Sequence, residues 1–262
     1  MDSAQLPGNV NYENDIQPMP TQYETAMQPP GLGAPGVPYE GVKTGMNTSV
    51  FKEPRGVMRI LQFVFSICAF ATTTGYTNKV KVEYSCNSTN TGKFELDISY
   101  PFRLDREGST VPCDPPLDFY LLGNSSSDAQ FFVAAGVLAF IYCILITVVY
   151  VLFDAMYQSN DHLPRADFIA TVVLAVLWLS GSAAWANGLS QIKMATNPSF
   201  LTSLCKQIAC SVSVGGSFSS LDISIILGFL NFFLWASDLW FLYKETSWFK
   251  MKQSSPNMAA TA

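Results

Sequence analysis

The segment 131–153, FFVAAGVLAFIYCILITVVYVLF, contains no charged residue. An α-helix rises 1.5 Å per residue, so about 20 residues cross the ~30 Å hydrocarbon layer of a bilayer. Three further apolar segments have a similar length: 60–76, 168–186 and 223–243. The first of these is long enough only if residues 57–59 begin the helix, with Arg59 extending its side chain toward the membrane surface. The sequence therefore predicts an all-α bundle of four transmembrane helices.

The composition agrees with a membrane protein. Charged residues make up 13% of the 262-residue chain and hydrophobic residues 49%, whereas soluble domains carry about 25% charged residues. We interpret residues 1–50, which are rich in Pro, Gly, Gln, Asn and Tyr, as a disordered cytosolic tail. Residues 51–248 would form the membrane domain and residues 249–262 a short second tail. The net charge of −5 comes with no basic stretch, so we expect no nucleic-acid partner.

The distribution of positive charge predicts the orientation, because an even number of spans places both termini on one side. That side carries Lys52, Arg55, Arg59, Arg165, Lys244, Lys250 and Lys252 near the span ends, and the other carries Lys79, Lys81, Lys193 and Lys206. Since cytosolic segments carry an excess of Lys and Arg, we expect cytosolic termini. The two lumenal loops would be about 77–129 and 187–222. The connection 154–167 would be a short cytosolic loop between antiparallel neighbours. No signal peptide precedes the first span, which is expected to start insertion itself.

Four cysteines fall in the two predicted lumenal loops: Cys86, Cys113, Cys205 and Cys210. Cysteines confined to one side of a membrane indicate disulfides in an oxidising compartment. Of the three possible pairings we favour Cys86–Cys113 and Cys205–Cys210, while bridges between the loops and free thiols remain alternatives. A zinc site is disfavoured by the spacing, and the only histidine, His162, lies on the opposite side.

The first lumenal loop is predicted to be partly β. Residues 79–84 and 93–98 alternate polar and apolar side chains, which is typical of strands in a small antiparallel sheet. The second loop is shorter and rich in Ser and Gly over 211–217.

Several side chains are candidates for modification. The sequon at Asn87 lies in the first lumenal loop, and we expect Asn87 to be the only glycosylated asparagine. Asn47 is cytosolic in this topology, and Asn124 lies too close to the second span. An unused sequon at Asn87 is the alternative. Three tail tyrosines, each followed by Glu, are candidates for phosphorylation or for binding cytosolic adaptors: Tyr12, Tyr23 and Tyr39.

The fourth span carries Ser224, Asn231 and Asp238, which are seven residues apart and so lie on one stripe of the helix. An ionisable residue inside a membrane is a functional candidate by default. We favour a polar stripe that fixes helix packing, with Asp238 paired to Arg59, over an ion or proton path. The reason is that we expect only one deep ionisable group, whereas relays usually need several. Tryptophans near the span ends are interpreted mainly as interfacial belts: Trp178, Trp185, Trp235 and Trp240.

The sequence shows no Gly-rich phosphate loop, metal-ligand spacing or nucleophile motif. We therefore expect neither an enzyme nor a resident cofactor. Two classes of function remain: a non-enzymatic membrane organiser and, as the alternative, an oligomeric channel or junction-type pore. A pore needs a continuous polar face on more than one span, and the sequence predicts such a face only on the fourth.

Over residues 50–248 the chain resembles the synaptophysin family, in order and on all four spans. The similar motifs are Lys52-Glu53-Pro54 followed by Gly56, Leu61-Gln62-Phe63, Ala69-Phe70-Ala71-Thr72, Tyr100-Pro101-Phe102-Arg103-Leu104, Trp178-Leu179, Ala184-Trp185-Ala186, Gly188-Leu189-Ser190, Lys193-Met194-Ala195-Thr196, Gly228-Phe229-Leu230-Asn231, Leu239-Trp240-Phe241 and Lys244-Glu245-Thr246.

The resemblance implies a MARVEL-type four-helix bundle with disulfide-bonded lumenal loops, resident in secretory or synaptic-like vesicles. It also implies homo-oligomers, association with cholesterol, and binding and sorting of the vesicle fusion protein synaptobrevin. The chain departs from the family in having its Pro/Tyr-rich tail at the N-terminus, Asp238 in place of an expected neutral amide, and Asn187 in place of an expected lysine. A non-neuronal or invertebrate relative therefore stays open.

Overall fold

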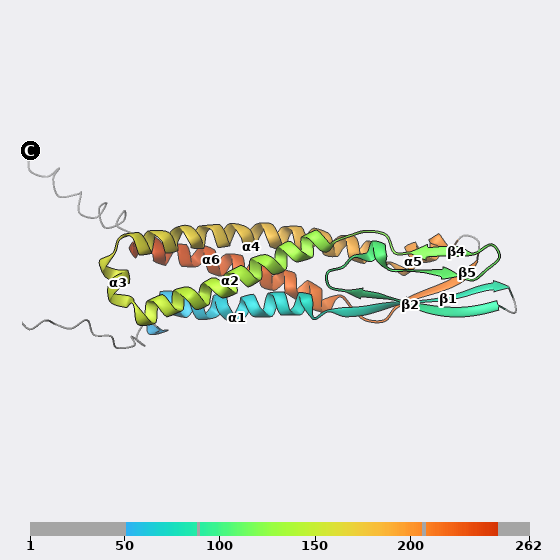
Figure 1. Ribbon diagram of the computed structural model, residues 1–262, viewed down its shortest axis with the longest axis horizontal. Coiled ribbons are helices and arrows are strands. Elements are labelled where there is room, and N and C mark those ends of the chain that lie inside the picture. Colours follow the sequence, from blue (N-terminus) through green and yellow to red (C-terminus); the bar gives the residue numbers. More distant parts are fainter. Residues whose placement is uncertain (1–50, 88–89, 206–207, 246–262) are drawn as a thin grey trace, which may run out of the picture. The chain divides into compact units, whose positions relative to one another are not determined.

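The computed structural model describes residues 51–87, 90–205 and 208–245. These residues all belong to the unit Thr44–Ala262. Its main feature is four long helices, shown in Figure 1: α1 (Pro54–Thr74), α2 (Ser126–Leu152), α4 (His162–Ala195) and α6 (Ser219–Glu245). All four are long and apolar enough to cross a membrane. The predicted four-helix bundle is therefore confirmed, and the short helix α3 (Asp154–Ser159) joins α2 to α4.

The helices begin earlier than the apolar runs that predicted them. In α1, Pro54 occupies the first turn, where its missing N–H costs no hydrogen bond and its fixed φ already suits a helix. The helix ends at Thr74, and the backbone N–H of the following Gly75 donates to the carbonyl of Ala71 (2.9 Å). This early start places Arg59 inside the second turn, as the length argument required.

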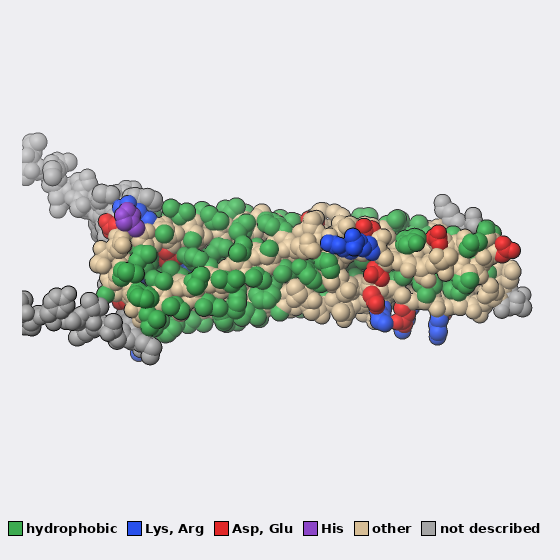
Figure 2. All heavy atoms as spheres, viewed as in Figure 1, with side chains coloured by type: hydrophobic (Ala, Val, Ile, Leu, Met, Phe, Trp, Pro, Cys, Tyr) green, Lys and Arg blue, Asp and Glu red, His purple; other side chains and the backbone are tan. Residues whose placement is uncertain are grey.

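The four helices form a closed ring of contacts. Helix α1 packs against α2 and α6, and α4 packs against the same two helices. The largest side chains of the core are fully buried between them: Trp178, Trp185, Trp235 and Phe132. The interpretation of Trp178, Trp185 and Trp235 as interfacial belts is therefore wrong, whereas Trp240 is 59% exposed and its interfacial position stays a prediction. Figure 2 shows hydrophobic side chains covering the helical part of the molecule, as a lipid-facing surface requires.

The strands lie beyond one end of the helices (Figure 1), which we call the sheet end; the opposite end, where α1 begins and α6 ends, is the tail end. Strands β1 (Thr77–Asn87) and β2 (Asn90–Ser99) form the predicted antiparallel hairpin. An unpredicted strand, β5 (Ala209–Val214), pairs with the other edge of β1 and gives the order β2-β1-β5. Strands β3 (Gly108–Val111) and β4 (Leu117–Tyr120) form a second, two-stranded sheet, and a single 3₁₀ turn, η2 (Leu104–Arg106), precedes them.

One of the four long helices extends beyond the bundle and packs against the sheet end. Helix α4 has 34 residues and is about 51 Å long, well beyond the ~30 Å of the hydrocarbon layer. Its last turns bury Leu189 and Ile192 in the same hydrophobic cluster as Val80 and Ile98 of the hairpin. The short helix α5 (Pro198–Leu204) follows. The second predicted loop therefore contains the end of α4, helix α5, strand β5 and the start of α6.

Candidate functional site

Arg59 joins three helices at the tail end of the bundle. Its side chain is only 1% exposed. Its Nη2 donates to Oδ1 of Asp167 on α4 (2.7 Å), and its Nη1 lies 3.0 Å from Oδ2 of Asp238 on α6. The structure thus brings together Arg59 and Asp238, the pair that the sequence suggested, and adds Asp167. We call Arg59, Asp167 and Asp238 the charge cluster.

Asp167 ties the remaining elements into the charge cluster. Its carboxylate accepts hydrogen bonds from the hydroxyls of Tyr142 (2.5 Å) and Tyr150 on α2, and from Tyr157 on α3 (3.1 Å). Assigning this residue to a cytosolic loop was wrong, because α4 already begins at His162. Helical spacing could have indicated this role. Asp167 lies one turn before Thr171, on the helix face that also carries Trp178.

Two neutral side chains and two aromatic rings complete the surroundings of Arg59. Gln62 accepts from Nη1 of Arg59 (2.9 Å) and donates to Oδ2 of Asp238 (3.1 Å). Thr171 accepts from Nη2 (3.0 Å). The guanidinium also lies over the rings of Tyr142 and Trp235, 5.4 and 5.3 Å from their centroids. Such a dense set of partners is what buried charges need to offset the loss of water.

The polar stripe of α6 faces a matching stripe on α4. Ser224, Asn231 and Asp238 are all fully buried, and so are Thr171, Trp178 and Trp185 of α4, which are likewise seven residues apart. At the sheet end, Nε1 of Trp185 donates to Oγ of Ser224 (2.9 Å). At the tail end, Arg59 links Thr171 to Asp238. Because the helices run antiparallel, the two stripes are joined at both ends, as polar core positions are when they set register.

The bundle buries more ionisable groups than the sequence predicted. From the sequence we expected one such group, whereas Arg59, Asp167 and Asp238 are all at most 3% exposed. They are nevertheless gathered at one level of the bundle and bonded to one another. Toward the sheet end the space between the helices is filled by Trp178, Trp185 and Phe132. The charge cluster is therefore suited to holding helices together.

Replacing Asp238 with asparagine is expected to preserve folding, because the amide can still accept from Arg59 and Gln62 without carrying a charge. Leucine at the same position is expected to weaken packing by about 1–2 kcal/mol, since it leaves Gln62 without its acceptor. Size-exclusion profiles and thermal unfolding of both variants in detergent measure the difference. If Asp238→Asn alone abolished function in a protein that still assembles, a purely structural role would be wrong.

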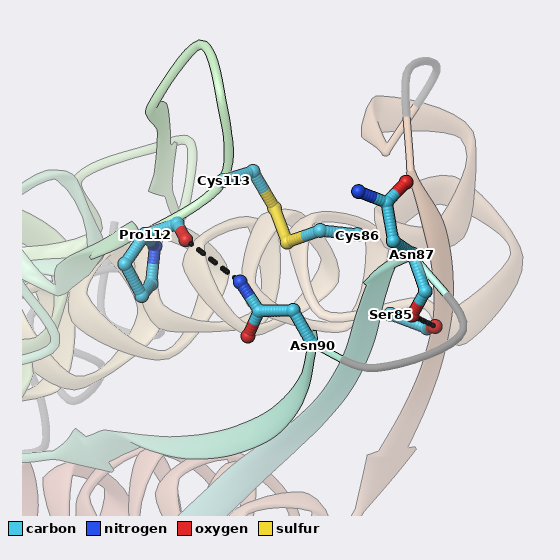
Figure 3. Close-up of a disulfide and its surroundings, with 6 residues drawn as sticks. All are labelled: Ser85, Cys86, Asn87, Asn90, Pro112 and Cys113. Atoms are coloured by element: carbon cyan, nitrogen blue, oxygen red, sulfur yellow. Dashed lines mark hydrogen bonds between the residues drawn. A yellow bond between two sulfur atoms is a disulfide. The ribbon is translucent and has the colours of Figure 1, made fainter.

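Two disulfides hold the sheet end together. Cys86, near the end of β1, is bonded to Cys113, after β3, with Cα atoms 5.6 Å apart. Cys205, after α5, is bonded to Cys210 in β5, with Cα atoms 6.2 Å apart. The favoured pairing within each loop is thus confirmed. Figure 3 shows the first bridge beside a hydrogen bond from Nδ2 of Asn90 to the carbonyl of Pro112 (3.3 Å).

The exposed face of the hairpin carries an ion-pair ladder. Nζ of Lys79 donates to Oε2 of Glu95 across the two strands (2.9 Å), and Lys81 lies 3.2 Å from the other oxygen of the same carboxylate. The hydrogen bond from Lys79 holds the pKa of Glu95 below its ordinary value. These pairs are exposed, so they contribute little stability. Among the described residues, no group of three or more His, Cys, Asp or Glu side chains is placed to hold a metal ion.

The modification candidates are placed in part. Asn87 is exposed at the end of β1, next to the Cys86–Cys113 bridge (Figure 3). Asn124 is exposed too, but its Oδ1 accepts from the backbone N–H (3.1 Å) and the hydroxyl (2.6 Å) of Ser126 at the start of α2. Four other candidates lie outside the described residues: Tyr12, Tyr23, Tyr39 and Asn47.

Asn87→Gln is expected to remove the whole glycosidase-sensitive shift of the protein on gels. Asn124→Gln is the matched control and should leave the shift unchanged, because that side chain is already engaged at the start of a helix. Expression in a secretory cell line followed by glycosidase treatment gives the readout. A shift that survives Asn87→Gln would mean that either the site or the sidedness of the loop is wrong.

The four apolar helices, with their buried charges paired inside the bundle, define a multi-pass integral membrane protein. Residues 50–241 match the family MARVEL, described as a membrane-associating domain. The match covers most of the chain, and the protein belongs to this family.

Proposed function

We propose that this protein is a non-enzymatic organiser of secretory or synaptic-like vesicle membranes, of the synaptophysin type within its family. The observation that carries the proposal is the internal pairing of the charge cluster. Because Asp167 and Asp238 both pair with Arg59 inside the bundle, the described helices present mostly apolar side chains outward. Such surfaces suit contacts with lipid and with the transmembrane helices of other proteins.

The partners in this proposal come from the family resemblance. They are synaptobrevin, which the protein would sort, further copies of the same chain, and membrane cholesterol. Both termini would face the cytosol, so that the N-terminal tail reaches adaptors, while the disulfide-bonded sheets would lie in the oxidising lumen. The outward residues available to a partner helix include Leu138, Ile141 and Leu145 on α2.

Proximity labelling in native cells tests this function. With the labelling enzyme fused to the N-terminus, the labelled proteins should be enriched in the small-vesicle fraction. Synaptobrevin should be among the most strongly labelled of them. A second fusion, with the enzyme inserted after Gly123 near the sheet end, is the topological control and should label lumenal proteins instead.

Two results would overturn the proposal. One is labelling confined to a compartment other than vesicles, with no enrichment of synaptobrevin. The other is a conductance of purified protein in planar bilayers that changes with Asp238→Asn, which would support the pore alternative. A pore would make Asp238 part of an ion path, whereas an organiser needs it only for packing.

A further inference from the structure

A groove of about 390 Å³ lies between α1 and α2. Ile60 on α1 and Ile144 and Val148 on α2 line it, and each is more than 40% exposed. The groove therefore opens on the outer surface of the bundle, where lipid surrounds the helices. Deeper in, the buried side chains of Arg59 and Cys143 contribute to its lining. Its volume falls within the range of small-molecule sites, about 300–1,000 Å³.

Arg59, one of the residues that line the groove, has a buried polar atom without a partner in the described part of the chain. The Nη atoms of Arg59 are bonded to the charge cluster, but its Nε has no hydrogen-bond acceptor among the described residues. An unmatched N–H in an apolar medium is costly. The groove thus combines apolar walls with a single unsatisfied donor, and its natural occupant is an apolar chain that carries a hydrogen-bond acceptor.

The charge of the cluster selects the kind of acceptor. Arg59 faces two carboxylates, Asp167 and Asp238, so an anionic group would add a third negative charge beside one positive charge. An uncharged acceptor avoids this repulsion. A hydroxyl, as in a sterol, brings a proton of its own that must also be paired, whereas an ester carbonyl only accepts. Arg59 also lies five residues after Pro54, about 7.5 Å along the helix, close to where lipid esters meet hydrocarbon.

We propose that the groove between α1 and α2 binds one acyl chain of a membrane glycerolipid, whose ester carbonyl accepts a hydrogen bond from Nε of Arg59. The occupant is a lipid of the leaflet at the tail end. This binding site is independent of the proposed vesicle function, since it needs only a bilayer around the helices.

The test uses the full chain in phosphatidylcholine nanodiscs that contain a phosphatidylcholine with a photoreactive acyl chain. Cross-links should concentrate on peptides that contain Ile60 and Ile144. Ile144→Trp fills the groove and should reduce them severalfold. Leu145→Trp is the control, because Leu145 is 60% exposed on the same helix and does not line the groove. Ile60→Phe narrows the opposite wall and serves as a second variant should Ile144→Trp fail to fold.

Competition experiments examine the carbonyl. Unlabelled diester phosphatidylcholine should compete about fivefold better than its diether analogue, as the loss of one hydrogen bond implies. Equal competition would overturn the contact with Arg59. The whole proposal fails if cross-links spread evenly over the lipid-facing helices, if both tryptophan variants behave alike, or if cholesterol displaces the probe more effectively than the diester lipid.

Discussion

Arg59→Leu is expected to destabilise the protein by about 3–5 kcal/mol, the largest effect of any single substitution in the bundle. The substitution leaves the carboxylates of Asp167 and Asp238 buried without their counter-ion, and breaking a buried ion pair from one side carries costs of this size. Arg59→Lys should do less harm, because it keeps the charge and loses only the forked geometry. Thermal unfolding in detergent and the yield of monodisperse protein report the difference.

A compensated variant provides the control. Arg59→Leu combined with Asp167→Asn and Asp238→Asn removes all three charges at once, and it should recover most of the lost stability. Replacing a whole buried ionic group by neutral residues is often nearly neutral, in contrast to removing one partner. If the triple variant were as unstable as Arg59→Leu alone, the packing of the arginine side chain, and not its charge, would be what holds the helices.

The second large effect is expected at the sheet end. Replacing both Cys86 and Cys113 with serine opens a bridge between residues 27 positions apart, which should cost roughly 3–4 kcal/mol on the chain-entropy relation. The Cys205–Cys210 bridge spans only 5 positions, and its removal should cost about 2 kcal/mol. Limited proteolysis and hydrogen exchange should show the sheets opening while the four helices stay protected.

Which disulfide costs more stability when it is removed tests whether loop length governs the effect. Equal losses, or a larger loss for the shorter bridge, would mean that the disulfides act through local contacts in the native state and that loop length is not the governing quantity. The free cysteine Cys143, which is buried in α2, offers a control. Its replacement by alanine changes the bundle and should leave the proteolysis of the sheets unaltered.

The sequence predicted the features that local chemistry determines. Uninterrupted apolar runs can be satisfied only by crossing a bilayer, so the four helices followed from hydropathy alone. The hairpin followed from alternation in residues 79–84 and 93–98. The presence of disulfides followed from the confinement of the loop cysteines to one side, whereas the favoured pairing was one of three until the structure confirmed it.

The missed features depend on contacts between distant segments. Strand β5 consists of small polar and apolar residues, and only the free edge of β1, more than a hundred residues earlier, makes it a strand. Asp167 precedes the apolar run of its helix, so hydropathy assigned it to a loop; its role appears only when Arg59 and three tyrosines surround it. The buried tryptophans Trp178 and Trp185 were misread because position along a span does not show whether a side chain faces lipid or a neighbouring helix.

A double-mutant cycle between Arg59 and Asp167 tests most directly whether the charge cluster locks the bundle. The free energy of unfolding would be measured in bicelles for the wild type, Arg59→Gln, Asp167→Asn and the combination. Since the two side chains bond across α1 and α4 at 2.7 Å, we expect a coupling free energy of about 2 kcal/mol or more, near the upper end for residues in contact. Effects that add to within about 0.5 kcal/mol, as for independent sites, would contradict this account.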